Sequence, residues 1–308
     1  MNEENVLLFF MDGVGLGEDD PENNPFVTAS LSNLTGLFGD GWYLKRQAPI
    51  ITGRASLVAT DACLGIAGRP QSASGQAAIL TGKNVPQLIG EHYGPKPNPA
   101  IAAIIQQGTL FHAVVNAGGR AGLITPYPQR YFDAINSGKR LLSSVPLAAS
   151  SAGVPLLTVD DLRAGRAISP GFTGQAWQDH LGYADIPVRT LAGAGRRIAQ
   201  IARGYHFCFF EHWPSDRSGH RGTLAEAVAH LEMLDAAIGG VLDGWSEQND
   251  AGLIVITSDH GNIEEKAHRS HTLNPVPTIL VGKRHAELAA GIIDLTDIAV
   301  VVRAVLEL

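Results

Sequence analysis

The sequence contains only two cysteines, Cys63 and Cys208, and they lie far apart in the chain. Both have apolar neighbours, which predicts two free, buried thiols and a reducing compartment rather than a disulfide. No stretch of eighteen residues is apolar and uncharged, so no membrane span is expected. The apolar run at residues 6–11 follows an acidic start and is too short for a signal peptide. We therefore expect a cytoplasmic protein.

The sequence also lacks a basic segment, and its net charge is −7. This argues against nucleic acid as a partner, whereas a phosphate ester can still bind an acidic protein if metal ions reverse the local field. No internal repeat or linker divides the 308 residues, of which 45% are hydrophobic. Length and composition favour one α/β domain with a modest insertion, and they leave the oligomeric state open.

The pattern of apolar residues predicts strands that alternate with helices. Apolar runs predict buried strands at residues 6–11, 121–125, 206–211, 253–257 and 278–281. Helical spacing predicts helices at 30–38, 77–80, 99–107, 188–203, 224–245 and 295–306. This order indicates a doubly wound α/β fold with a mostly parallel sheet. Residues 126–187 hold helical fragments and no strong strand, so we expect them to form a small cap-like insertion between 1–125 and 188–308.

Acidic and histidine side chains follow three of the predicted strands. Asp12 follows the first strand, Asp216 and His220 follow the third, and Asp259 and His260 follow the fourth. In open α/β sheets, ligand groups collect beyond the carboxyl ends of the strands. Taken singly, Asp12 could be a helix N-cap and the others ordinary loop residues. Their repeated placement after buried strands favours a divalent-metal site, to which His271 can add a ligand.

The segment around Asp216 and His220 is open to two interpretations. Residues four apart on a helix share one face, which would bring both side chains together. The serines and glycine at 215, 218 and 219 favour a loop instead, in which the two can still converge. Thr223 and Glu226 form a capping box that predicts the start of the next helix.

Residues 70–75 are small or turn-forming and precede a predicted helix. A serine at a helix start meets backbone amide donors and the positive end of the helix dipole, which suits a nucleophile. An ordinary serine N-cap is the alternative. Ser72 and Ser74 both lie in this segment.

Taken together, these segments resemble a known family. MDGVG, QSASGQ, DRSGH, SDHGN and HTLNPVP are similar to the metal-binding motifs of the alkaline phosphatase superfamily, nearest its cofactor-independent phosphoglycerate mutase and phosphopentomutase branch. The likeness covers about residues 6–17, 70–84, 216–245 and 253–282, and DHGN followed by HTxNPVP is its most specific part. It implies an alkaline-phosphatase-like fold with two metal sites. The implied ligands are Asp216, His220 and His271 at one site, and Asp12, Asp259, His260 and the Ser72 oxygen at the other.

The implied chemistry is phosphoryl transfer with Ser72 as the nucleophile. Oxygen and nitrogen ligands without thiolate favour two manganese or zinc ions over magnesium. Paired ions can stabilise the attacking and leaving oxygens of an in-line displacement. The expected reaction passes through a phosphoserine on a small phosphorylated metabolite, with hydrolysis favoured. The alternatives are a phosphoglycerate or phosphopentose mutase, a sulfatase or phosphodiesterase, and a non-catalytic metal-binding protein.

The sequence departs from the mutases in ways that bear on the substrate. Gln76 stands where the mutases have a histidine, the Asp-Gly-Arg-Asp substrate signature is absent, and the chain is shorter. These departures argue against phosphoglycerate as the substrate. Possible phosphate or substrate contacts, each of which alone is more typical of solvated surface charge, are Arg54, Lys83, His92, Lys96, Arg130 and Arg140.

Overall fold

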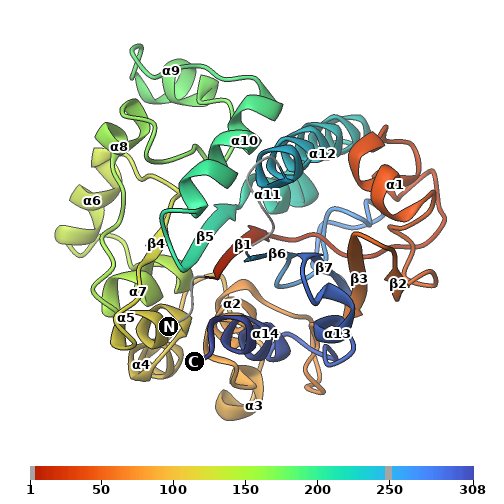
Figure 1. Cartoon of the computed structure of the whole chain (residues 1–308), viewed down its shortest axis with the longest axis horizontal. Coiled ribbons are helices and arrows are strands. Elements are labelled where there is room, and N and C mark those ends of the chain that lie inside the picture. Colours follow the sequence, from red (N-terminus) through yellow and green to blue (C-terminus); the bar gives the residue numbers. More distant parts are fainter. Residues whose placement is uncertain (1–3, 247–251) are drawn as a thin grey trace.

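The protein is described by a computed structural model that covers residues 4–246 and 252–308 (Figure 1). Its seven-stranded sheet has the order β2-β3-β7-β6-β1-β5-β4. The strands are β1 (Asn5–Met11), β2 (Ile50–Ile51), β3 (Ala55–Thr60), β4 (Ala121–Leu123), β5 (Phe207–His212), β6 (Gly252–Thr257) and β7 (Val276–Gly282). β2 and β7 run against the other five. The expected α/β fold with a mostly parallel sheet is confirmed.

The central strands are mostly apolar because helices cover both faces of the sheet. In β1, Val6, Leu8 and Phe10 belong to one core, and the alternate residues Leu7 and Phe9 belong to the other. A strand that is buried on both faces has no solvent-exposed side on which polar residues would be favoured. This explains why the runs at 6–11, 206–211 and 253–257 do not alternate.

Two layers of helices enclose the sheet (Figure 1). The first core holds side chains from α2 (Ser72–Thr81), α3 (Val85–Ile89), α4 (Pro99–Gln107), α5 (Leu110–Asn116), α13 (His285–Ala289) and α14 (Asp297–Leu306). The second holds side chains from η1 (Pro25–Val27), α1 (Ser32–Phe38), α10 (Leu191–Ala202) and α12 (Leu224–Ser246). The doubly wound arrangement follows from these two separate cores.

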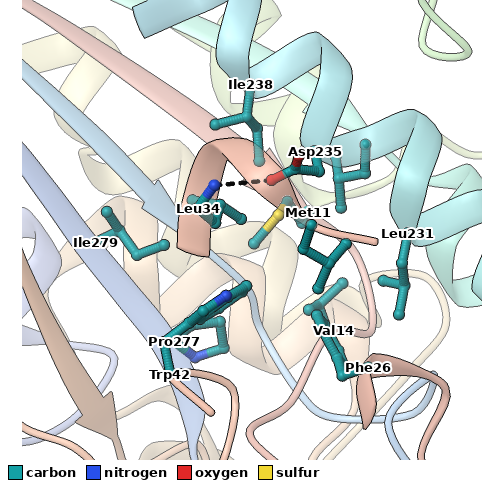
Figure 2. A pocket seen from close by; sticks show the side chains of 12 residues that line it. Met11, Val14, Phe26, Leu34, Trp42, Leu231, Asp235, Ile238, Pro277 and Ile279 are labelled. Atoms are coloured by element: carbon teal, nitrogen blue, oxygen red, sulfur yellow. Dashed lines mark hydrogen bonds between the residues drawn. The ribbon is translucent and has the colours of Figure 1, made fainter. Parts of the chain in front are cut away.

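Helix α1 is held in place by an acidic residue from α12. The N-cap residue Leu31 has no side-chain hydrogen bond to offer the first turn. The buried carboxylate of Asp235 accepts from the backbone amides of Asn33 at 3.0 Å and Leu34 at 2.9 Å instead. Figure 2 shows Asp235 beside Leu34 at a small apolar cavity of about 10 Å³ between these helices and the sheet. A remote carboxylate thus performs the capping that the local sequence lacks.

Residues 126–187 contain α6 (Gln129–Asn136), α7 (Ser144–Ser151), α8 (Val159–Arg163) and α9 (Gln175–Leu181). Helix α7 packs into the first core, whereas Leu162, Trp177 and Ile186 form a small cluster of their own. The division into a catalytic domain and an insertion stays a prediction, and residues 1–3 and 247–251 of that domain lie outside the described residues. Among the described helices, none combines the length and apolarity that crossing a membrane requires.

Two expectations from the sequence were wrong. The segment Pro214–Arg221 is a helix, α11, and not a loop. Proline at its first turn is compatible with a helix, and Lys266 Nζ donates to the last-turn carbonyls of Ser218 at 3.0 Å and Gly219 at 2.5 Å. Cys63 is half-buried rather than buried, because it lies in the bend after β3, although both cysteines are free as expected.

Candidate metal centre and active site

The predicted ligands meet at one edge of the sheet. Phe10 is level with Glu211 on β5 and with Thr257 on β6, so the three parallel strands end together. Asp12 follows β1 directly, α11 follows β5, and Asp259 follows β6. Gly13 adopts a left-handed φ of +71°, and a Cβ there would collide with Asp216. The turn after β1 therefore needs glycine to let α11 approach.

Asp216, His220 and His271 form the first group of candidate ligands. Helix α11 places Asp216 and His220 one turn apart on the same face, 3.3 Å apart from Oδ1 to Nε2. His271 Nε2 lies 3.1 Å from His220 Nε2 and 3.7 Å from Asp216 Oδ1. Three ligand atoms thus face a common point.

The histidine tautomers in this group favour a bound cation. His220 Nδ1 lies 2.6 Å from the carbonyl of Arg269, and His271 Nδ1 lies 2.7 Å from the carbonyl of Pro70. A carbonyl only accepts, so each Nδ1 carries the proton and each Nε2 presents a lone pair. Two lone pairs that face each other at 3.1 Å repel unless a cation lies between them. This is the usual orientation of metal-binding histidines.

Asp12, Asp259, His260 and Ser72 form the second group. His260 Nε2 lies 3.4 Å from Asp12 Oδ1, 3.6 Å from Asp259 Oδ2 and 3.0 Å from Ser72 Oγ. Ligands of a tetrahedral ion, each at about 2.1 Å, would be separated by roughly 3.4 Å. Asp12 Oδ1 is buried and has no hydrogen-bond partner among the described residues. The residues present therefore fit a divalent ion.

The two groups adjoin each other at His260. Its ring stacks on that of His271, with centroids 3.6 Å apart and planes 15° apart. The ligand atoms of Asp216, His260 and His271 lie within 4.8 Å of one another, as do those of Asp12, Asp259 and His260. His260 thus stands between the groups, and all seven predicted ligands lie in one connected site.

Without bound cations, burial and the repulsion between like charges disfavour the charged forms of the side chains in this site. Burial, followed by the charges of Asp259, Asp216 and Glu211, holds the pKa of Asp12 well above its usual range. Burial and then the Asp216 charge raise the pKa of Asp259 to about 8. Burial, with His271 nearby, keeps the pKa of His260 well below its usual range. Bound divalent ions would stabilise ionised carboxylates and neutral imidazoles together.

Three supporting residues were not predicted from the sequence. Asn262 Nδ2 donates to Asp216 Oδ1 at 2.7 Å, and Gln76 Nε2 donates to Asp259 Oδ2 at 3.0 Å. Glu264 accepts from the amide of Asn262 at 2.8 Å. Such contacts orient metal ligands. The signals in the sequence are weak: Asn262 and Glu264 follow the Asp-His pair, and Gln76 lies one helical turn after Ser72, where the mutases have a histidine.

The structure distinguishes the two candidate serines. Ser72 is the first residue of α2, and its hydroxyl faces His260. Ser74 is fully buried, donates to the carbonyl of Gln71 at 3.2 Å and accepts from the amide of Tyr93 at 3.0 Å. Ser74 therefore holds the loop before α2 in place, and of the two serines it is Ser72 that lies among the candidate metal ligands.

The six candidate substrate contacts do not gather in one place. Arg54 precedes β3 at the edge opposite the site, because Ala55 pairs with Val281. Lys83 lies beyond the far end of α2, roughly 16 Å along its axis from Ser72. Arg130 is exposed on α6. None of the three meets the metal ligands.

His92, Lys96 and Arg140 lie nearer to the segment around Ser72. His92 lines an open cleft of about 400 Å³ with Gln71, the residue before Ser72. The guanidinium carbon of Arg140 lies 4.9 Å from the centre of the Tyr131 ring. Burial and the Arg140 charge lower the pKa of Lys96. Within the described part of the chain, neither cation forms an ion pair with a carboxylate, so both are available to an anion.

Fold and site together define a metal-dependent enzyme. The family model of the Metalloenzyme superfamily matches residues 189–303. A 2,3-bisphosphoglycerate-independent phosphoglycerate mutase of Thiobacillus denitrificans is 41% identical over 81 residues, which is 24% of this chain and 15% of that protein. The corresponding mutase of Syntrophotalea carbinolica is 44% identical over 72 residues, or 21% and 14% of the two chains. The matches thus span less than a fifth of these relatives.

Solved structures share the whole fold. A protein of Pyrococcus horikoshii has a TM-score of 0.57 at 15% identity, covering 100% of this chain and 98% of that one. The alkaline phosphatase of the Antarctic bacterium TAB5 has a TM-score of 0.55 at 14% identity, covering 98% and 97%. At these identities the likeness concerns the fold alone. Together with the family model and the mutase matches, each of which covers part of the chain, it supports the predicted resemblance to the alkaline phosphatase superfamily, near its cofactor-independent phosphoglycerate mutase branch.

Proposed function

We propose that this enzyme transfers the phosphoryl group of a small phosphate ester to Ser72 and then to water. The observation that carries the proposal is the position of Ser72 Oγ, 3.0 Å from His260 Nε2 and at the first residue of α2. The hydroxyl therefore meets candidate metal ligands and the positive end of a helix dipole together. Both features favour an ionised serine oxygen and an anionic substrate.

The two steps balance without a further reactant. The Ser72 oxygen forms a bond to phosphorus, the bond from phosphorus to the ester oxygen breaks, and the alcohol leaves with a proton. Water then attacks the phosphoserine, which releases inorganic phosphate and returns the hydroxyl of Ser72. Two divalent ions, when bound, supply charge that lowers the pKa of the serine hydroxyl and neutralises phosphate oxygens.

The residues around Ser72 support each step in a specific way. Gly75 lets α2 pack against the loop after β6, because a Cβ there would lie 3.0 Å from the carbonyl oxygen of Asp259. The unpaired charges of Lys96 and Arg140 can attract the substrate phosphate.

Seven oxygen and nitrogen ligands without thiolate favour manganese or zinc over magnesium. The two free cysteines are consistent with a cytoplasmic location.

Hydrolysis is favoured over mutase activity because of the insertion. A mutase has to shield its phosphoserine from water while the substrate turns, which requires a closing cap that grips the substrate. The separate apolar cluster of residues 126–187 consists of only Leu162, Trp177 and Ile186 with a few partly buried neighbours. A mutase is the second candidate, because the curated relatives reported above are mutases, although the matches cover only 14–15% of their length.

Two parallel assays on one manganese-loaded sample test the proposal. We expect slow release of inorganic phosphate from several small phosphate esters, and no efficient interconversion of 3- and 2-phosphoglycerate. Fast interconversion without phosphate release would show the mutase instead. Absence of both activities, with full metal occupancy, would favour a binding protein. The Ser72→Ala variant is the control for contaminating phosphatase.

A further inference from the structure

We infer that Gln76 is a positioning residue that holds Asp259 in place for one of the two metal ions and not for the other. The inference deepens the proposed function, because it concerns the same site, but its test measures metal binding and does not depend on turnover.

The position of Gln76 on α2 directs it into the site. It follows Ser72 by four residues, so both side chains share a face of the helix. Only 4% of Gln76 is exposed, and its Nε2 donates to Asp259 Oδ2 at 3.0 Å. Asp259 Oδ2 is also the oxygen that lies 3.6 Å from His260 Nε2. The amide thus contacts the carboxylate oxygen that belongs to the second group of ligands.

The orientation of the amide follows from its surroundings. If it were flipped, its oxygen would face a carboxylate oxygen and the hydrogen bond would be lost. Gln76 Oε1 is therefore turned away, and it is buried without a hydrogen-bond partner among the described residues. A buried, unpaired carbonyl costs about 1–3 kcal/mol. A side chain kept in this unfavourable state has a role beyond filling space, and its one side-chain hydrogen-bond partner among the described residues is Asp259.

No other described residue can replace this contact well. Asp259 Oδ1 has the amide of Gly13 as its neighbour at 3.4 Å, which is a long hydrogen bond. The first group has its own equivalent, since Asn262 donates to Asp216 Oδ1 at 2.7 Å. Gln76 and Asn262 thus each orient one carboxylate, on opposite sides of His260. This separation makes the two roles distinguishable by experiment.

The test is a manganese titration of the full chain after chelation, followed by calorimetry. In Gln76→Leu, the affinity for one ion should fall about 10- to 100-fold, while that for the other stays unchanged. Asn262→Leu should weaken the other ion, and the double variant should weaken both. Gln76→His, which keeps a donor, should recover part of the lost affinity.

The His220→Ala background assigns the ions to their groups. It lacks a ligand of the first group, so the tighter remaining ion should be the one that Gln76→Leu weakens. Unchanged affinities in Gln76→Leu, or an equal loss at both ions, would overturn the inference.

If Gln76→Leu does not fold, as judged by circular dichroism, the comparison of Gln76→His with Gln76→Glu replaces it. There the glutamate should weaken one metal-binding step through loss of the donor, and equal binding by the two variants would contradict the inference. Metal binding as expected without phosphate release would refute the proposed function and leave the role of Gln76 intact.

Discussion

The carboxylate of Glu264 accepts a hydrogen bond from the backbone amide of Gly15, 2.9 Å away. This contact ties the turn after β1, which carries Asp12, to the loop after β6, which carries Asp259. Glu264 is 1% exposed and also accepts from Thr272 Oγ1 at 2.5 Å and from Asn274 Nδ2 at 3.1 Å. One buried acid therefore joins three segments of the candidate centre.

Glu264→Gln should destabilise the protein by on the order of 2 kcal/mol, because an amide nitrogen replaces an acceptor oxygen among donors. The measurement is urea unfolding with a chelator present. Glu265→Gln is the matched control, since the side chain of Glu265 accepts, among the described residues, a single hydrogen bond, from the amide of the exposed Ala267. Equal stability of the two variants would contradict the assigned role.

Metal analysis of the purified protein should give two divalent ions per chain. Asp259→Asn and His271→Ala should each lower the occupancy and the activity, because each removes a charged or lone-pair ligand. His268→Ala serves as the control, because the one hydrogen bond of the His268 ring in the part of the chain that the structure describes is from the amide of Ser270. Full metal occupancy in both variants would contradict the assignment of Asp259 and His271 as metal ligands.

Ser72→Ala should abolish the phosphoenzyme, whereas Ser74→Ala should retain it. Rapid acid quenching followed by peptide mapping identifies the labelled residue. Ser74→Ala should instead cost about 1 kcal/mol of stability, because it leaves the amide of Tyr93 without its acceptor. Label on Ser74 alone would mean that the nucleophile is misassigned.

Glu211 should make the stability depend on pH. Burial raises its pKa to about 7 from an ordinary 4.5, against the opposing effect of the Tyr127 hydroxyl, which donates at 3.0 Å. A carboxyl whose pKa is raised on folding stabilises the protein fully below 4.5, and that contribution is lost as the pH rises through 7. Glu211→Gln removes this dependence.

The stability of Glu211→Gln relative to the wild type should therefore rise between about pH 4.5 and 7, by on the order of 3 kcal/mol, and level off above. Chelated samples unfolded in urea at several pH values provide the measurement. A constant difference across this range would show that Glu211 does not titrate there.

The strands with continuous apolar runs could be predicted from the sequence, but β3 could not. Its segment Ala55–Thr60 contains buried serine and threonine, whose partners come from distant segments. Ser56 Oγ lies 2.8 Å from His285 Nδ1, and Thr60 donates to Thr278 at 2.7 Å. The antiparallel pairing with β7 and the contact with α13 make these polar residues suitable for a core.

Helix α11, at the candidate site, also could not be predicted from the local sequence. Serine and glycine weigh against a helix when residues are considered locally. Gly219 is needed because a Cβ there would collide with Asn262, and Lys266 binds the carbonyls at the helix end. The convergence of the candidate ligands could be predicted, since each lies in a recognisable motif. Gln76, Asn262 and Glu264 act only after separate loops have met, so no local pattern marks them.

The central position of β1 affects the order in which the chain can be assembled on the ribosome. Val6 pairs with Phe207 on one side and with Leu253 on the other. β1 thus precedes both of its neighbours in the chain, and its apolar residues stay uncovered until β5 and β6 have been synthesised. Such distant pairings slow folding and leave apolar surface open to association in the meantime. A nascent chain halted before β6 should therefore depend strongly on chaperones.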